Sequence, residues 1–444
     1  MLGAVNFEFQ PPGYFVALWL WRQVHPSLVW ARSLSVICTT ISIVVFYQIV
    51  RRVAVNRAIW PIWASAAFAF HPYTIFAATE IRLYAMGLLL TVVQLDWYWK
   101  GFVEEKNKWR WAYLAIAVVS LYVNVLLALS LAAHQIALWA TDRRKLALQH
   151  LAIVVLAAAI YLPMFVVQLR SLKVKDLSVD SSLAKSFSFV IGSVAYNLAP
   201  LPRLDETLNV RTGLTFILVV VAGAIILRNW RAISERHRIA WVYLIAVMSL
   251  LGLFLLTAHL RLNPRYTYPL IAASLLAWGL VIEFIRARSF IVAIWLGTLL
   301  FCAGTLWSTY HPLCKTGDWI RLTHYLETHE ADNEPIVVFI SEVDTILKNY
   351  YHGRNIVVPV PGPQRLDRFV YADFDIKNPE IPQSVLESKL QAIDAFWLVT
   401  NEAAIQDGPH EYHQQYLHEY LHQNFEVVQC QNFVDSKVCR LQRK

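Results

Sequence analysis

Long apolar runs fill the first 308 residues of this 444-residue chain. A membrane-spanning helix needs about 20 mostly apolar residues, within a range of about 17–25. Only Asn124 separates two of the runs, which indicates a tight turn there. The composition agrees with membrane insertion, because 16% of the residues are charged against about 25% in soluble domains. This criterion predicts ten spans, at roughly 29–51, 58–77, 83–99, 109–123, 125–141, 146–168, 211–228, 239–258, 267–286 and 289–308.

The net charge of +8 is unevenly distributed. Residues 309–444 hold 12 basic and 19 acidic side chains, a net −7, whereas residues 1–308 hold 27 and 12, a net +15. Basic residues gather in every second connection between the predicted spans, which is typical of cytoplasmic loops. The basic excess therefore indicates membrane orientation and no nucleic-acid partner. It predicts a multi-pass protein of the plasma (inner) membrane, with the residues before the first span and the tail outside the cytoplasm.

Three regions follow from these patterns. Residues 1–28 are expected to form an outer-face loop and a short interfacial helix, since the stretch 12–21 is too short to span. Residues 29–308 form the predicted all-α polytopic membrane domain. Residues 309–444 are expected to form a small extracytoplasmic α/β domain, because short β-branched runs alternate there with helix-like stretches. Its predicted strands are 336–340, 356–360 and 396–400, with a closing hairpin of 425–430 and 437–441.

Cysteine use in the tail is informative, because an extracytoplasmic compartment permits disulfides. Cys430 and Cys439 face each other across the predicted hairpin. Spacing alone leaves open whether they are bonded, since a disulfide also requires suitable geometry.

Three clusters of polar residues map to the predicted outer face. They contain Glu8 before the interfacial helix, Glu80, Arg82 and Tyr84 between the second and third spans, and Arg261, Arg265 and Tyr266 between the eighth and ninth. Arginine binds phosphate oxygens through paired hydrogen bonds. A carboxylate serves as a general base or as a ligand of a divalent cation. Pairing with lipid headgroups is the simpler explanation for one arginine, but three such turns on one face favour a site for a lipid phosphate.

The order of several motifs resembles a known enzyme family. The run Phe9-Gln10-Pro11-Pro12-Gly13-Tyr14-Phe15 precedes Arg32-Ser33 and the pair Arg51-Arg52, and later come His71-Pro72, Glu80-Ile81-Arg82-Leu83-Tyr84, Tyr161-Leu162-Pro163, Pro264-Arg265-Tyr266 and Asp318-Trp319-Ile320-Arg321. This series is similar to that of GT-C fold, family-39-type glycosyltransferases. The group includes protein O-mannosyltransferase-like enzymes and the aminoarabinose transferase of lipid A.

The resemblance implies an inverting glycosyltransferase that moves a sugar from a polyprenyl-phosphate donor to a glycan, lipid or protein acceptor outside the cytoplasm. Glu8 and Glu80 are the expected catalytic residues and, if Mg or Mn is used, the expected ligands of that cation. The donor phosphate is expected to bind Arg82, Arg261 and Arg265, with Tyr84 and Tyr266 beside them. A non-catalytic protein that binds or flips polyprenyl-phosphate lipids is the alternative.

The chain departs from the family pattern at its start. Family members have a first span and an acidic outer loop ahead of the Pro-Pro segment, whereas this chain begins almost at Pro11. Three explanations stay open: truncation at an internal Met, transfer of the acid's role to Glu8, or an inactive protein.

Overall fold

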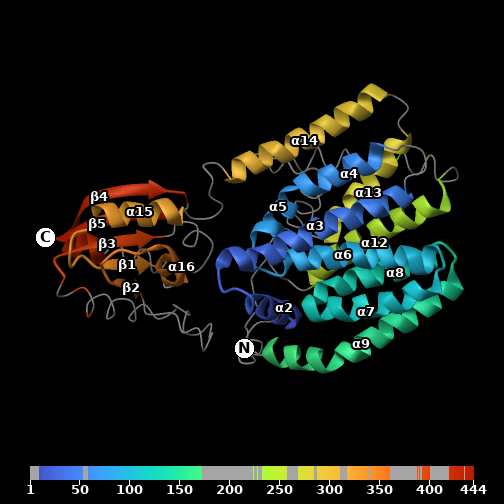
Figure 1. The fold of residues 1–444 in the computed structure, drawn as a ribbon, viewed down its shortest axis with the longest axis horizontal. Coiled ribbons are helices and arrows are strands. Elements are labelled where there is room, and N and C mark those ends of the chain that lie inside the picture. The colour runs from blue at the N-terminus through green and yellow to red at the C-terminus, as the bar shows by residue number, and fades with distance from the viewer. Residues whose placement is uncertain are drawn as a thin grey trace. The chain divides into compact units, whose positions relative to one another are not determined.

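The computed structural model describes residues 10–53, 59–172, 233–257, 269–284, 288–310, 318–339, 342–360, 393–400, 420–434 and 436–444, together with positions 224, 228, 388 and 390. The chain divides into two compact units, a helical unit up to Ser308 and a unit that contains a sheet from Thr309 onward (Figure 1). In outline, the chain has a mostly helical architecture with one small sheet domain.

Several consecutive helices of the first unit pack against each other as antiparallel pairs. They are α2 (Gly13–Arg22), α3 (Leu28–Val53), α4 (Ile59–Phe70), α5 (Pro72–Thr79), α6 (Tyr84–Tyr98), α7 (Asn107–Val123), α8 (Ala128–Ala140), α9 (Arg144–Leu172), α12 (Glu235–Thr257), α13 (Pro269–Phe284) and α14 (Arg288–Tyr310). A π-helical turn, Trp99–Val103, extends α6, and a 3-10 turn, Val125–Leu127, precedes α8. The predicted turn between two spans lies at Asn124, where the extended backbone separates α7 from α8 and Oδ1 accepts a hydrogen bond from the amide of Leu126 at 3.0 Å.

Three described helices are long and apolar enough to cross a membrane: Leu28–Val53, Arg144–Gln168 and Glu235–Phe254. The total of ten spans therefore stays a prediction. The outward faces of these helices are apolar. On α9, for example, Leu148, Val155 and Leu162 are more than half exposed. Contiguous exposed apolar surface is rare on soluble monomers and is the surface that a bilayer covers.

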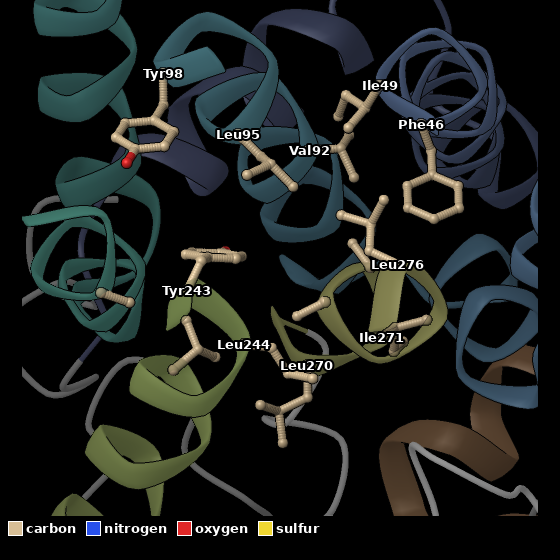
Figure 2. Close-up of a cluster of buried hydrophobic side chains, with 14 of the residues drawn as sticks. Phe46, Ile49, Val92, Leu95, Tyr98, Tyr243, Leu244, Leu270, Ile271 and Leu276 are labelled. Atoms are coloured by element: carbon tan, nitrogen blue, oxygen red, sulfur yellow. The ribbon is translucent and has the colours of Figure 1, made fainter. Parts of the chain in front are cut away.

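The interior of the helical unit is built from the facing sides of α3, α6, α12 and α13. Figure 2 shows Phe46 of α3 near Leu276 of α13, Leu95 of α6 in the same interior, and Tyr98 of α6 and Tyr243 of α12 on the other side of the view. All these side chains are buried. In water, burial of apolar surface contributes a free energy of about 25 cal/mol per Å². Helices that leave lipid to pack together do not gain this free energy, and close packing and interhelical hydrogen bonds hold them together instead.

Polar contacts at one end of the helical unit bring distant connections together. Arg143 donates to the carbonyl of Phe102 at 3.0 Å and pairs through Nε with Glu235 at 2.8 Å. His237 Nε2 bonds the carbonyl of Val53 at 2.9 Å. We call this the basic end, because the predicted cytoplasmic arginines and lysines of four connections gather there. The sidedness of that end in the membrane stays a prediction.

One ion-pair cluster joins α3 to α6 near the basic end. Asp96 of α6 is buried, and its two carboxylate oxygens contact Arg52 Nη1 of α3 and Lys100 Nζ, the latter at 2.5 Å. The π-helical turn carries Lys100. This pairing indicates a structural role for Asp96, because removal of one member of a buried ion pair leaves the remaining charges without a partner.

Replacement of Asp96 by Asn should destabilise the protein by about 3 kcal/mol, because Arg52 and Lys100 would lose their shared counter-charge in a poorly hydrated site. Thermal unfolding of the purified protein in detergent measures the loss. Asp142→Asn is the matched control: Asp142 is 86% exposed and pairs with exposed Arg144 at 3.3 Å, so its loss should cost less than about 0.5 kcal/mol. Equal melting temperatures for the two variants would contradict the assignment.

The second unit is a five-stranded mixed sheet with the order β2-β1-β3-β5-β4. Its elements are α15 (Trp319–His329), β1 (Ile336–Phe339), α16 (Glu342–Tyr350), β2 (Val357–Val360), β3 (Ala395–Thr400), β4 (Phe425–Phe433) and β5 (Ser436–Arg443). β1 pairs in parallel with β2 and β3, whereas β5 is antiparallel to β3 and β4. The three expected strands and the hairpin are therefore present. One of the helix-like stretches of the sequence, 412–422, lies mostly outside the described residues.

Side chains alternate across this sheet as the period of two requires. Ile336 and Val338 of β1 pack with Leu322 and Leu326 of α15. Val337 and Phe339 enter a second cluster on the opposite face. Both faces of β1 are thus covered, which explains why its four residues are all buried and uniformly apolar.

The hairpin of β4 and β5 carries a disulfide. Cys430 and Cys439 are directly opposite in the strand register and are bonded, with a Cα–Cα distance of 4.1 Å. The bond settles the question that spacing left open. It also agrees with an oxidising compartment for this unit.

In cells, both cysteines should resist maleimide labelling until a reductant is added, because the bonded sulfurs are not nucleophilic. By the chain-entropy estimate, a loop this short stabilises the unit by about 2.5 kcal/mol, so Cys430→Ser/Cys439→Ser should be digested faster by added protease. A gel-shift assay and limited proteolysis check the two outcomes. The chain has three further cysteines, Cys38, Cys302 and Cys314. Their replacement by Ser in both backgrounds removes their own labelling signal. Full labelling without reductant would show that the bond does not form in the cell.

Candidate functional site

A charged turn lies between α5 and α6, at the end of the helical unit away from the basic end. The chain reaches it through a break at His71, whose extended backbone ends α4 and whose Nδ1 accepts a hydrogen bond from the amide of Tyr73 at 3.2 Å. Pro72 then begins α5, because proline is favoured in the first helical turn. His71-Pro72 thus marks a kink between α4 and α5. α5 ends at Thr79, and Glu80 follows in extended conformation.

Glu80 and Arg82 form a loose ion pair in this turn. The distance from Glu80 Oε2 to Arg82 Nε is 3.9 Å, and the two side chains are 27% and 58% exposed. Exposed ion pairs of this length contribute little to stability. The pair is therefore better suited to meeting a ligand than to holding the turn. Tyr84 begins α6 and is buried, with its ring tilted against Phe76 at a centroid distance of 5.7 Å.

The backbone of the turn is held by a residue far away in the chain. Buried Ser35 of α3 donates from Oγ to the carbonyl of Glu80 at 2.6 Å. Ser35 thus fixes the backbone position from which the Glu80 side chain extends. A serine inside a membrane span is unremarkable in a sequence, and only its position across from residue 80 reveals the role.

Tyr14 of α2 lies beneath the same turn. It is 3% exposed. Burial raises the pKa of its hydroxyl well above the ordinary value, and the Glu80 carboxylate adds to that rise while Arg82 opposes it. The hydroxyl is therefore neutral at physiological pH and lies within electrostatic range of both charges. Sequence reasoning did not single out Tyr14 or Ser35 as site residues.

The position of α2 depends on close packing at Gly13. A Cβ atom at this position would lie 2.5 Å from the carbonyl oxygen of Tyr122 in α7, so only glycine permits the contact. At its other end, α2 is tied to the start of α3 by Trp21 and Trp30. Their rings stack at 4.8 Å, and each indole donates to the other's backbone carbonyl, at 2.9 and 2.8 Å. The expected short helix before the first span is thus present and firmly seated.

Of the seven site residues predicted from sequence, the structure places three. Glu80, Arg82 and Tyr84 come together in the turn before α6. Glu8, Arg261, Arg265 and Tyr266 lie outside the described residues. Within the described ranges, no group of three or more His, Cys, Asp or Glu side chains is arranged to hold a metal ion. The cation site expected from Glu8 and Glu80 stays a prediction.

A second buried polar cluster lies among α6, α7, α8, α9 and α12. The His134 ring stacks between Tyr98 and Tyr243, at centroid distances of 4.1 and 4.7 Å. Tyr113 Oη bonds His134 Nδ1 at 2.9 Å and His150 Nε2 at 3.0 Å. His134 is therefore a hydrogen-bonded residue between helices. The cluster is closed on all sides, so it serves packing rather than ligand binding.

The sheet unit has a cavity of about 430 Å³ at the start of α15. The Asp318 carboxylate there pairs with Arg321 Nε at 2.5 Å. Both residues belong to the family-like segment at the start of this unit. The cavity is lined by Asp318, Arg321, Gln431, Asn432, Phe433 and Val434.

Comparison with known proteins bears on the fold. No family model and no curated protein matches the chain. Among solved structures, the chain is similar to the crystal structure of ArnT from Cupriavidus metallidurans bound to undecaprenyl phosphate, with a TM-score of 0.55 and 14% sequence identity. The match covers 97% of this chain and 87% of that chain. ArnT is a GT-C glycosyltransferase. At 14% sequence identity, the structural similarity is evidence about the fold alone. On that evidence, this chain has a GT-C-like fold.

Proposed function

We propose that this protein is a membrane glycosyltransferase that moves a sugar from a polyprenyl-phosphate donor to an acceptor on the extracytoplasmic face. The acceptor would be a glycan, a lipid or a protein. The observation that carries the proposal is the accessible Glu80–Arg82 pair at the end of the helical unit opposite the basic end. The GT-C-like fold supports it, since the similar ArnT structure holds undecaprenyl phosphate.

The two charges have complementary tasks in such a reaction. The acceptor hydroxyl attacks the anomeric carbon of the sugar and forms the new glycosidic bond, with inversion at that carbon. Glu80 takes the hydroxyl proton as general base. The bond from the anomeric carbon to the phosphate oxygen breaks, and the electron pair leaves with the phosphate. Arg82 stabilises the negative charge that develops there.

The depth of the turn suits a lipid donor. Ser35, which holds Glu80, is seven positions after the start of α3 at Leu28, or about 10 Å along the helix. A phosphate at Arg82 would therefore lie near the membrane boundary, with its polyprenyl chain in the hydrocarbon region. We further propose that Arg261, Arg265 and Tyr266 join this site, because they follow α12, which runs away from the basic end.

Membranes that contain the wild-type protein should release sugar from a radiolabelled polyprenyl-phosphate donor. Glu80→Gln should lower kcat about 10²–10⁴-fold, because the general base is lost. Arg82→Ala and Arg265→Ala should lower kcat/KM for the donor through lost charge-assisted hydrogen bonds. Glu105→Gln and Arg144→Ala are controls at exposed positions of the basic end, and they should match wild type.

If wild type released no more sugar than Glu80→Gln and Arg265→Ala, the enzymatic proposal would be wrong. Donor binding without transfer, unaffected by Glu8→Gln and Glu80→Gln, would instead favour the lipid-binding or lipid-flipping alternative. That alternative needs the arginines for the phosphate but no base.

A further inference from the structure

The cavity at the start of α15 has a buried carboxylate in its wall. Asp318 is 6% exposed and directly precedes α15, a position where an aspartate side chain commonly caps the helix. The Asp318 side chain makes no capping hydrogen bond. Its Oδ2 instead pairs with Nε of Arg321 in the first turn of the helix. Because a carboxylate has sites for several hydrogen bonds, Asp318 keeps acceptor capacity at the cavity that it lines.

The opposite wall of the cavity is the end of the β4–β5 hairpin. Two contacts hold this end against α15: the amide of Asp318 donates to the carbonyl of Val434 at 3.3 Å, and the ring of Tyr325 meets that of Phe433 edge-on at a centroid distance of 5.8 Å. The hairpin disulfide lies directly before Gln431. The cavity is therefore preformed, and its volume of about 430 Å³ lies within the range of about 300–1,000 Å³ of small-molecule sites.

The hairpin offers this cavity an amide and an aromatic ring. Gln431 is opposite Val438 in the strand register, and Val438 packs in the hydrophobic cluster beside α15. Because side chains alternate along a strand, Gln431 and Phe433 share this face of the sheet. The Gln431 amide has both donors and an acceptor, whereas half-buried Phe433 provides apolar surface.

The charges of the cavity disfavour an anionic ligand. Helix N-termini and arginines commonly bind phosphate, but the Asp318 carboxylate already occupies the start of α15 and neutralises Arg321 at 2.5 Å. An incoming anion would be repelled by that carboxylate. A neutral ligand that both donates and accepts hydrogen bonds suits the cavity better. Hydroxyl groups do both, and a sugar ring adds an apolar C–H face.

We propose that the cavity of the sheet unit binds a neutral saccharide. Hydroxyl groups of a sugar ring donate to the Asp318 carboxylate and bond the Gln431 amide, and the apolar face of the ring packs on Phe433. The assignment does not depend on the proposed function, since a transferase and a lipid-binding protein alike can carry such a site.

Saturation-transfer NMR of the full-length protein, in a detergent without a sugar headgroup, tests the assignment. The probes are the methyl glycosides of glucose, galactose, mannose and N-acetylglucosamine at about 10 mM, which detects a Kd in the millimolar range or below. At least one should bind wild type. Asp318→Asn should raise its Kd about tenfold or more, because a charged acceptor is lost, and Gln431→Ala about threefold or more, because a neutral hydrogen bond is lost.

Gln442→Ala is the matched control. Gln442 is an exposed glutamine of β5 in the same hairpin and does not line the cavity, so this variant should bind as wild type does. Gln431 is also exposed, which keeps the test decisive if Asp318→Asn misfolds, and wild-type resistance to limited proteolysis checks the fold of each variant. If wild type bound none of the four glycosides, or if Gln431→Ala and Gln442→Ala bound equally well, the assignment would be overturned.

An anionic probe separates a saccharide site from a phosphate site. Glucose 6-phosphate should bind wild type no more tightly than the neutral glycosides do, because Asp318 neutralises Arg321. Tighter binding of glucose 6-phosphate that is lost in Arg321→Ala would show that the cavity selects anions and would overturn the assignment.

The saccharide site and the proposed function fail separately. If wild type binds a methyl glycoside but releases no sugar from the polyprenyl-phosphate donor, the saccharide site stands and the transferase proposal falls. If wild type releases sugar from that donor but binds none of the glycosides, only the saccharide site falls.

Discussion

Two polar contacts set the relation between α3 and α6, and the candidate site depends on that relation. Ser35 of α3 holds the carbonyl of Glu80 just before α6, and Arg52 of α3 pairs with Asp96 near the other end of α6. The apolar faces between these contacts have little preference for one register, since lipid is as apolar as the side chains. The polar contacts therefore define the register of the pair. A shift of either helix by one turn would break both.

The site is assembled on this pair from short segments rather than from one motif. The break at His71 allows α5 to deliver Glu80 in extended conformation, and Gly13 allows α2 to place Tyr14 beneath the turn. Neither segment could do so as part of a continuous long helix. Irregular backbone at this depth is tolerated because the surrounding helices and side chains satisfy its polar groups, as Ser35 does for Glu80.

The features predictable from sequence are those with a strong local signal. The turn at Asn124 and the strands around Val337, Val358 and Leu398 follow from apolar length and β-branched composition. The break at His71 follows from Pro72. The grouping of Glu80, Arg82 and Tyr84 follows from their closeness in the chain. Long-range contacts have no such signal: Ser35 reaches Glu80 across 45 positions, and nothing in a serine within an apolar run predicts its partner. The π-helical turn at Trp99–Val103 is similarly hidden, because its composition matches that of an ordinary helix end.

The spacing of the two contacts on α3 has a consequence for the membrane in which the protein works. Ser35 and Arg52 are 17 positions apart, or about 26 Å along the helix, against a hydrocarbon core of about 30 Å. The protein therefore has a hydrophobic thickness set by its own polar contacts rather than by the lipid. In a thicker bilayer the turn at Glu80 would sink below the level of the lipid phosphates, or the bilayer would have to thin around it. Acyl-chain length of the host membrane thus becomes a determinant of whether a lipid headgroup and the charged turn meet at the same height.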